Sequence, residues 1–389
     1  MASAENSTSV RQLVGVVGAV VFVDTMFYAA IAPLLPALSH ELRLSKLSAG
    51  VLTASYPLGT LVGSVPGGLL AARAGPKLTV CAGLTLLAVS TLAFGFLHGA
   101  VSLDIARFVE GLGGACSWAG GLAWIVAESP PERRGALMGS ALGAAIGGAL
   151  FGPVIGTVAT AVGRGAAFSG VVVIAVLLVD RARRLHSSHV ASDQGVRQLI
   201  EARHSRPLMA GMWLVALPAV ASGLLNVLGP LRLHHFGAGA AAIGAVFLIA
   251  AAVEATISPI LGRVSDLRGR LVPLRIGLLA ATALLLCFTL PRTAVLLGVV
   301  LVAVSAALGA FWAPAMAMLS DAAEARSLDQ GLAAALINLA WAGGQIAGSG
   351  AGGALAKAAG DGVPIAALAG LCALTLLAIL RRPGMADVG

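Results

Sequence analysis

The sequence predicts an all-α membrane protein in which twelve transmembrane helices form two pseudo-symmetric six-helix bundles. Three observations predict this fold class. The 389-residue chain is 58% hydrophobic and 11% charged, whereas a soluble domain carries roughly 25% charged residues. Its apolar residues are gathered in runs of about 20, the helix length that crosses a hydrocarbon core of about 30 Å. The second half of the chain also repeats spaced residues of the first half.

The first half contains six predicted spans. They cover residues 11–37, 47–71, 77–97, 101–127, 135–162 and 165–180. Their internal glycines and prolines are compatible with helices, because membrane spans tolerate both residues. The first run has the length of a span and no cleavage-like site follows it, so we expect no cleavable signal peptide. Residues 1–180 are therefore predicted to form the N-terminal six-helix bundle.

A polar segment separates this half from six further apolar runs. Residues 181–206 hold six arginines and are predicted to form a cytoplasmic basic linker, part of it as a short amphipathic helix over 196–204. The later spans cover residues 207–233, 240–262, 272–290, 294–319, 330–357 and 363–380. Residues 207–389 are therefore predicted to form the C-terminal six-helix bundle.

The distribution of basic residues predicts the orientation. With both termini inside, 18 of the 25 Lys and Arg residues fall in inner segments and 6 in outer ones, while Arg107 lies within a span. This excess is the positive-inside signal. We expect a multi-pass protein of the cytoplasmic membrane with both termini in the cytoplasm. The net charge of +8 is then topogenic, and no nucleic-acid partner is expected.

An internal repeat relates the two halves. Glycines of the fifth predicted span recur in the eleventh at a constant offset of 196 residues: Gly135, Gly148, Gly152 and Gly156 match Gly331, Gly344, Gly348 and Gly352. The residues Ser64, Gly68 and Gly75 likewise match Ser258, Gly262 and Gly269 at an offset of 194. Duplicated six-span halves are typical of secondary transporters, which bind substrate near the midplane between their repeats.

Three motifs stand within this framework. The loop after the eighth span reads Gly262-Arg-Val-Ser-Asp266-Leu-Arg268-Gly269-Arg270. The loop after the second span keeps Gly68, Arg73, Gly75 and Lys77. In that loop, Ala72 stands at the position of the aspartate and Pro76 stands at the position of an arginine. The fourth span contains Arg107-Phe-Val-Glu110-Gly111-Leu-Gly113, and the fifth contains Gly139, Gly148, Gly152-Pro153 and Gly156, followed by Thr157.

These motifs resemble those of the major facilitator superfamily, and the resemblance covers essentially the whole chain. It implies the major facilitator fold. It also implies gating or conformational roles for Gly68, Arg73, Gly75, Gly262, Asp266, Arg268, Gly269 and Arg270, and for Gly148, Gly152, Pro153 and Gly156. The fourth-span motif resembles one that the family links to proton coupling, with Glu110 in place of the usual glutamine. The fifth-span motif is similar to the antiporter signature of drug:proton antiporters, with Thr157 replacing its last glycine.

Within the antiporters, the first span resembles the twelve-span drug:proton group that includes multidrug efflux and vesicular amine transporters. The residues that carry this likeness are Val23-Asp24-Thr25-Met26, leading to Pro33-Leu-Leu-Pro36. Asp24, the acidic residue of that span, is part of the match.

Ionisable residues inside spans are costly and mark transport pathways by default. Arg107 and Glu110 are three residues apart and can pair on one helix face. The pair either fixes helix packing only, or it lets Glu110 take up and release a proton. Asp24 needs a partner from another helix unless it faces a cavity, where it would be a proton site or a counter-charge for a cationic substrate. For Glu254, a packing role and a transport role are equally open.

Other polar and aromatic residues could line a substrate cavity. With Asp24, we select Tyr28, Trp118, Asn226, Asn338, Trp341 and Gln345, and we note Tyr56, Trp124 and Trp312 as further candidates. Each aromatic residue alone is as readily explained by packing or by lipid contact, since tryptophan is common at membrane interfaces.

Glycine stripes indicate close helix contacts. We expect Gly59, Gly63 and Gly67 of the second span to face Gly344, Gly348 and Gly352 of the eleventh. We expect the glycines of the fifth span to face the eighth. Smooth contacts of this kind would let the two halves rock.

Together these features predict a proton-coupled antiporter that exports small amphipathic compounds, cationic ones included. The alternative is a dedicated single-metabolite carrier, either an exporter or a proton symporter, on the same fold. We find no nucleophile set, phosphate loop or metal-ligand spacing, so we expect neither an enzyme nor a metal site. The expected partners are a small-molecule substrate, protons and the lipid bilayer. The energy source is a proton gradient rather than a cofactor, and we expect a monomer.

Overall fold

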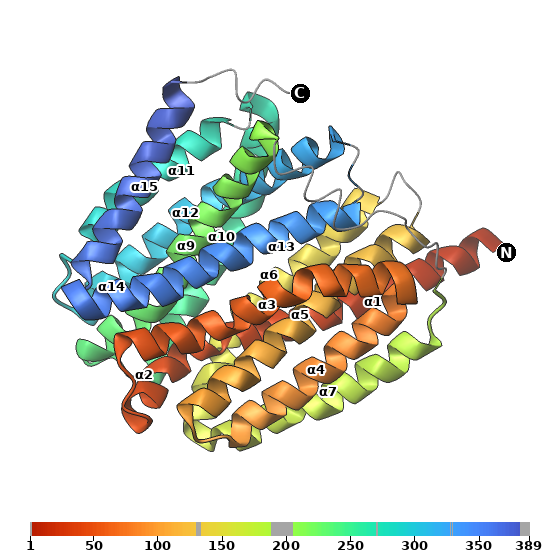
Figure 1. Cartoon of the computed structure of the whole chain (residues 1–389), viewed down its shortest axis with the longest axis horizontal. Helices are drawn as coiled ribbons and strands as arrows, with labels where there is room; N and C mark the ends of the chain where they lie inside the picture. Colours follow the sequence, from red (N-terminus) through yellow and green to blue (C-terminus); the bar gives the residue numbers. More distant parts are fainter. Residues whose placement is uncertain are drawn as a thin grey trace. The chain divides into compact units, whose positions relative to one another are not determined.

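The computed structural model describes residues 2–129, 134–187, 205–269, 271–326, 328 and 330–381, and these are almost entirely helical. The helices of the first half are α1 (Ala2–Ala29), α2 (Ile31–Glu41), α3 (Lys46–Ala74), α4 (Pro76–Phe96), α5 (Ala100–Glu128), α6 (Arg134–Val162) and α7 (Arg164–Arg184). Those of the second half are α9 (Arg206–His235), α10 (Ala240–Arg268), α11 (Leu271–Cys287), α12 (Ala294–Glu324), α13 (Gln330–Ile346), the π-helical η2 (Ala347–Ala351), α14 (Gly352–Ala359) and α15 (Gly362–Arg381) (Figure 1). Each of the twelve predicted spans is found as one helix or as a broken helix.

Two of the predicted spans are broken, each for a local reason. The first is divided at Ala30 into α1 and α2, because Pro33 has no amide hydrogen and its ring crowds the carbonyl four residues earlier. The eleventh is divided by η2, where Ser349 Oγ donates a hydrogen bond of 2.7 Å to the carbonyl of Gln345. Wider π-type turns of this kind inside a helix are often found at functional sites.

The helices have the length and hydropathy of membrane spans. Among the described residues, eight helices are long and apolar enough to cross a bilayer, the pair α1–α2 counting as one, and α11 is a shorter apolar helix. Many large apolar side chains on these helices are exposed, for example Val173 at 63% and Val299 at 61%. A surface of this kind is suited to lipid.

The chain divides into two compact units. Unit 1 comprises Met1–Ile31, Ser55–Glu201 and Leu328–Leu339. Unit 2 comprises Ala32–Ala54, Ala202–Ser327 and Ala340–Gly389. The long helices α3 and α13 are therefore each divided between the two units.

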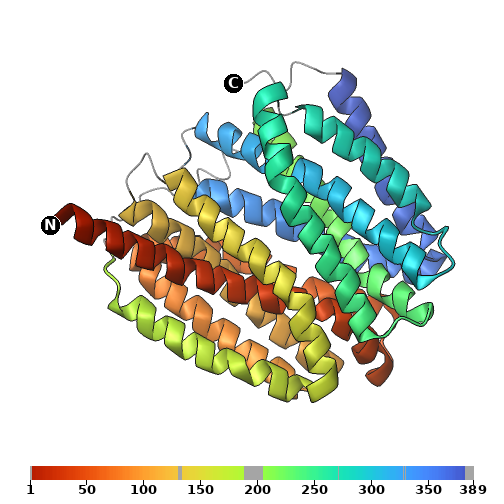
Figure 2. The same ribbon diagram turned by 180° about the vertical axis from the view of Figure 1, so that it is seen from behind.

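In unit 1, α1 packs along α6, and α4 packs between α5 and α7. The helices α4 and α7 lie side by side in both views (Figures 1 and 2). The core at one end of the unit gathers Val17 of α1, Leu84 of α4 and Trp124 of α5, all fully buried. In unit 2, α12 packs against α9, α10 and α11, and α15 packs against α11.

The turns of the two halves repeat the same backbone geometry. Gly75 has φ 96° and ψ 149°, and Gly269, which lies 194 residues later, has φ 84° and ψ 150°. Gly163 (φ 90°, ψ 145°) and Gly360 (φ 82°, ψ 165°) are 197 residues apart. This region of backbone space is nearly exclusive to glycine. A third pair, Arg43 and Gly237, also has positive φ and is again separated by 194 residues. The internal repeat predicted from the sequence is thus found in the backbone itself.

The glycine stripes are close contacts, but their predicted partners were wrong. Side-chain atoms added at Gly59 or Gly63 would meet Phe108 and Leu112 of α5, so this stripe packs on the fourth span. Gly148 and Gly152 approach Phe22 and Met26 of α1 rather than the eighth span. The stripe of the eleventh span, Gly344, Gly348 and Gly352, lies on Ala216, Val220 and Leu224 of α9. The glycines therefore hold together helices of the same half.

The second and eleventh spans do meet, at other residues. A Cβ atom added at Gly50 would overlap the carbonyl oxygen of Ser349, and one at Gly353 would press on Lys46. All four residues belong to unit 2. The contact is made by the first turns of α3 and not by the stripe further along it.

Two hydrogen bonds hold the chain where it leaves α7. The Lys77 ammonium donates to the carbonyl of Leu185 at 2.8 Å, and the indole N–H of Trp124 donates to the carbonyl of His186 at 3.1 Å. Trp124 is therefore a packing and anchoring residue. The predicted linker 181–206 overlaps the last turn of α7, and its segment 188–204, with the predicted amphipathic helix, lies outside the described residues.

Candidate functional site

Asp24 of α1 is completely buried and is held by donors from two other helices. The Tyr56 hydroxyl of α3 lies 2.8 and 2.9 Å from the two carboxylate oxygens. The Trp118 indole N–H of α5 donates to Oδ2 at 3.0 Å. A structural Asp24 is expected to find its partner on another helix, and Asp24 has two such partners. Both donors are neutral groups.

Arg107 and Glu110 form the predicted pair on α5. Arg107 Nη1 lies 3.0 Å from Glu110 Oε2, and both side chains are almost fully buried, at 2% and 3% exposure. The guanidinium also donates to the carbonyls of Phe27 and Tyr28 at the end of α1, at 3.4 and 3.3 Å. Glu110 Oε1 and Arg107 Nε are buried without a hydrogen-bond partner among the described residues. The pair therefore keeps unused hydrogen-bonding capacity.

Two tyrosines join these groups into one cluster. The Tyr28 and Tyr56 rings are 4.8 Å apart between centroids. The guanidinium carbon of Arg107 lies 5.0 Å from the Tyr56 ring and 5.7 Å from the Tyr28 ring, a cation–π geometry. Tyr56 thus contacts Arg107 with its ring and Asp24 with its hydroxyl. We call the six residues Asp24, Tyr28, Tyr56, Arg107, Glu110 and Trp118 the buried carboxylate cluster, and all six lie in unit 1.

Small residues make room for the cluster. Arg107, Glu110, Gly114 and Trp118 follow one another at intervals of three and four, which places them on one face of α5. A Cβ atom at Gly114 would lie 2.5 Å from the Tyr56 hydroxyl and 2.8 Å from Asp24 Oδ1. A Cβ atom at Gly111 would overlap the Tyr56 carbonyl oxygen. The fourth-span glycines thus allow α3 and α1 to bring their polar groups onto α5.

The other cavity candidates lie elsewhere. Asn226 on α9 and Asn338 and Trp341 on α13 are partly exposed. Gln345 is 3% exposed, and its Oε1 atom has no hydrogen-bond partner among the described residues. Glu254 of α10 packs its side chain over Gly309 of α12, which gives its predicted packing role a structural basis. The Trp312 side chain lies outside the described part of the chain.

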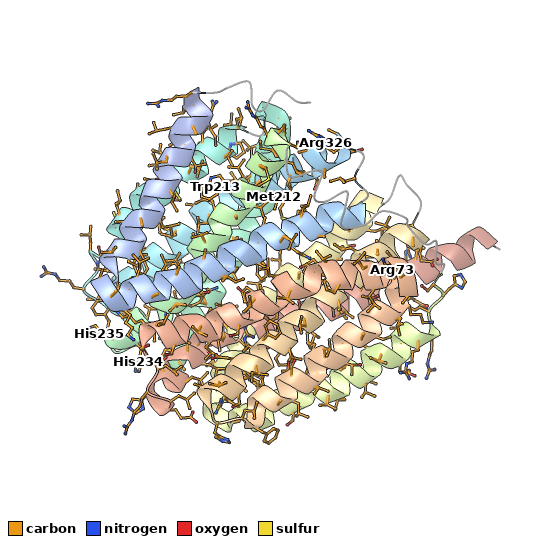
Figure 3. All side chains as sticks on the ribbon, in the orientation of Figure 1. Arg73, Met212, Trp213, His234, His235 and Arg326 are labelled. Atoms are coloured by element: carbon orange, nitrogen blue, oxygen red, sulfur yellow. The ribbon has the colours of Figure 1, made fainter. Side chains whose placement is uncertain are left out.

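The predicted gating residues occupy helix ends. Arg73 is exposed at the end of α3 (Figure 3). A Cβ atom added at Gly68 would meet open space. Gly75 and Gly269 form the equivalent turns described above. The side chains of Asp266 and Arg268, and the whole of Arg270, lie outside the described residues, and nothing beyond its place in α10 is described for Gly262. Pro153 lies inside α6.

Most residues of the cluster are predictable from the sequence, but the contacts that join them are not. Tyr56 was only one of several aromatic candidates, because nothing in its own helix distinguishes it. Gly114 carries no chemical signal at all, although its place between Glu110 and Trp118 on one face of α5 could have revealed it. Helical spacing finds neighbours on one helix, whereas the contacts of Asp24 depend on how three helices pack.

Chemically, the cluster contains two carboxylates and one guanidinium, all of them buried. With both carboxylates ionised it carries one net negative charge, and one bound proton makes it neutral. A buried uncompensated charge is costly. The arrangement can therefore hold a proton or a cation, and it offers no nucleophile beside a general base. Among the described residues no group of acidic, histidine and cysteine side chains could hold a metal ion.

The sequence similarities to curated proteins are partial. Over 114 residues the chain is 29% identical to the quinolone resistance protein NorA of Staphylococcus aureus (strain MRSA252). The aligned segment covers 29% of this chain and 29% of NorA. Over 125 residues the chain is 27% identical to the MFS-type transporter ppzB of Metarhizium majus (strain ARSEF 297). This second alignment covers 31% of this chain and 27% of that protein. The alignments thus span less than a third of the length of these relatives.

Solved structures show the same fold over nearly the whole chain. The xylose transporter XylE from E. coli, in a partially occluded inward-open conformation, covers 96% of this chain with a TM-score of 0.74 and 14% identity, and 98% of XylE is covered. A D-xylose-proton symporter covers 94% of the chain with a TM-score of 0.72 and 18% identity, and 96% of that protein is covered. At these identities the likeness establishes the fold and not the substrate.

The family model settles the membership. The model of the Major Facilitator Superfamily matches residues 17–290 and 212–387, which together cover nearly all of the chain. The helical architecture agrees with this match, since the twelve predicted spans are all found as helices or broken helices. This is a family of membrane transporters for small molecules and not of enzymes. The chain belongs to the major facilitator superfamily.

Proposed function

We propose that this chain is a proton-coupled antiporter that exports small amphipathic compounds, cationic ones included, from the cytoplasm by alternating access. The observation that carries the proposal is the buried carboxylate cluster, in which Arg107 pairs with Glu110 while Asp24 is held by the neutral donors Tyr56 and Trp118. The fifth-span glycine motif and the partial similarity to a quinolone resistance protein support export of drug-like compounds. The proton gradient is the energy source, without a cofactor.

The charge balance of the cluster gives the exchange a physical basis. One proton neutralises the cluster, and so does one monovalent cationic substrate at Asp24. Because a second positive charge would have to be buried uncompensated, the two should exclude one another. Such mutual exclusion is what an antiporter requires.

The residues of the cluster have different proposed roles. Asp24 holds either the proton or the substrate cation, and Tyr56 and Trp118 stabilise its carboxylate while it is empty. Glu110 is the second proton site, with Arg107 holding one of its oxygens and leaving Oε1 free to accept a proton. Tyr28 and Trp118 offer aromatic faces to an amphipathic substrate. We propose substrate contacts for Asn226, Asn338, Trp341 and Gln345 as well.

Proton flux in proteoliposomes tests this proposal. Purified protein is reconstituted with a pH gradient, and substrate-dependent proton movement is recorded for a panel of lipophilic cations and neutral drugs. We expect several unrelated compounds to drive flux, and Asp24→Asn and Glu110→Gln each to abolish or uncouple it. Asp180→Asn is the matched control, because Asp180 is 49% exposed and pairs with Arg184 at the surface. Wild-type coupling in both cluster variants would refute the proposal.

The same measurement distinguishes the alternative. A dedicated carrier for one metabolite would respond to a single compound or to none of the panel. Flux in which proton and substrate move in the same direction would identify a symporter. We also propose that the protein is a monomer in the cytoplasmic membrane with both termini inside, as its distribution of basic residues favours.

A further inference from the structure

A second polar site lies in unit 2, in a pocket of about 650 Å³ at the end of α9. The pocket is bounded by the start of α3, the last turn of α9, the loop after α11 and the turn before α15. Its charged lining residues are Lys46, Arg232, Arg292 and Asp361, with His235 beside them. Figure 3 labels His235 at this end of α9. None of these residues belongs to the buried carboxylate cluster.

Basic groups outnumber acidic ones in the pocket. Asp361 is the one acid among the described lining residues, and two cations share it: Lys46 Nζ lies 2.5 Å from Oδ1, and Arg232 Nη1 lies 3.5 Å from Oδ2. Arg292 adds a third positive charge. With histidine neutral, the lining residues carry two positive charges in excess. The pocket therefore favours an anion.

Arg232 is held in place without being saturated. Its Nη2 donates to the carbonyl of Thr289 at 2.8 Å, and its guanidinium carbon lies 5.7 Å from the Phe236 ring and 5.9 Å from the Phe288 ring. Its Nε is buried without a partner among the described residues. A guanidinium fixed in this way has free donors and loses little entropy when it binds an anion.

The remaining lining is mostly apolar. Leu228, Leu231, Leu290 and Pro291 surround the cationic groups, and Leu290 is 69% exposed. A small inorganic anion would use only the basic residues. An amphiphile with an anionic head and a hydrocarbon chain would use both parts of the lining, and the ends of spanning helices are where lipid head groups lie.

We propose that this pocket binds the phosphate of an anionic phospholipid. Arg232 and Arg292 donate hydrogen bonds to the phosphate oxygens, in the planar geometry that guanidinium groups offer to phosphate. The first segment of the acyl chain lies on Leu231 and Leu290. Asp361 competes with the phosphate for Arg232, because the same guanidinium faces both. In the orientation proposed above, the lipid belongs to the outer leaflet.

Native mass spectrometry of the purified full-length chain tests this site. The protein in detergent is titrated with phosphatidylglycerol, with zwitterionic phosphatidylcholine and with inorganic phosphate. We expect phosphatidylglycerol to bind more tightly than either of the others. Arg232→Gln and Arg292→Gln should each weaken this binding by about fivefold, the effect of one basic residue near an anionic lipid. Asp361→Asn should strengthen it, since it removes the competing carboxylate.

The variants also define the result that overturns the proposal. Arg183→Gln makes the same change in net charge at an exposed position at the end of α7 and should leave the tight site intact. Equal weakening by Arg183→Gln and Arg232→Gln would show that net charge alone determines binding. Inorganic phosphate that binds as tightly as the lipid would indicate an anion site without a lipid. Because Arg292 is exposed, its variant tests the pocket even if changes at Arg232 or Asp361 unfold the protein.

Discussion

At the scale of single residues, the two carboxylates of the cluster are stabilised differently. Glu110 is paired with a cation at 3.0 Å, whereas Asp24 is held by the neutral donors Tyr56 and Trp118. We expect Tyr56→Phe to lower stability by about 1.5–3 kcal/mol if Asp24 is ionised, the usual effect of losing a hydrogen bond to a charged group. Thermal unfolding of the solubilised protein measures this loss. The substitution keeps the ring, and with it the contact to Arg107.

A double-mutant cycle separates the hydroxyl from other effects. If Tyr56 acts through Asp24, then Tyr56→Phe should cost much less in an Asp24→Asn background than in the wild type. Full additivity of the two variants would mean that the hydrogen bond does not stabilise the protein.

Gly114 is the residue that gives Asp24 its space. Gly114→Ala would place a methyl group 2.8 Å from the Asp24 carboxylate and 2.5 Å from the Tyr56 hydroxyl. We expect a loss of about 1–3 kcal/mol, typical of overpacking a buried site, together with loss of transport. Thermal unfolding and proton flux record the two effects. Gly143→Ala on α6, where a Cβ atom meets nothing within 4 Å, should leave both unchanged or slightly increase stability. Equal behaviour of the two variants would argue against a crowded cluster.

At the scale of elements, the turns between helices depend on glycine backbone geometry. Gly269 and Gly360 combine φ of 84° and 82° with extended ψ, and a Cβ atom at either would meet nothing within 4 Å. Alanine there would cost about 1–3 kcal/mol through backbone strain alone. Gly370→Ala inside α15 is the control, since its Cβ atom also meets open space but its φ is helical. If all three substitutions left the thermal unfolding temperature unchanged, the strained turns would not contribute to stability.

The elements were largely predictable, and their partners were not. Apolar runs of spanning length located the twelve spans, because the bilayer fixes both helix length and polarity. The break at Ala30 and the π-helical segment Ala347–Ala351 depend on local hydrogen bonding that hydropathy does not record. Gly59 and Gly148 were recognised as contact residues but were assigned to the wrong helices. A small residue shows that some helix approaches closely without showing which one.

The same reason limits prediction of the sites. The spacing of Arg107 and Glu110 on one helix was enough to predict their ion pair. The contacts of Lys46 with Asp361 join residues 315 positions apart, and neither belongs to a motif. Long-range polar contacts of this kind follow from the packing of several helices, which the sequence specifies only collectively.

At the scale of the whole molecule, the distribution of charge predicts the orientation in the membrane. Of the 25 basic residues, 18 fall in segments that face the cytoplasm if both termini are inside, and 6 fall on the opposite side. Retaining Lys and Arg on the cytoplasmic side is the dominant rule for short loops. Arg73 at the end of α3 and Arg292 in the loop after α11 are both exposed and are predicted to lie on opposite sides.

Cysteine labelling in intact cells tests this orientation. In a background where Cys81, Cys116, Cys287 and Cys372 are replaced by alanine, Arg292→Cys should react with a membrane-impermeant maleimide, and Arg73→Cys should react only after the cells are permeabilised. Since each variant removes a single basic residue, the remaining excess still determines the topology. The opposite pattern would place both termini outside and move the pocket around Arg232 to the cytoplasmic leaflet. It would also reverse the direction in which the buried carboxylate cluster exchanges protons for substrate, so that the exporter would have to be reconsidered as an importer.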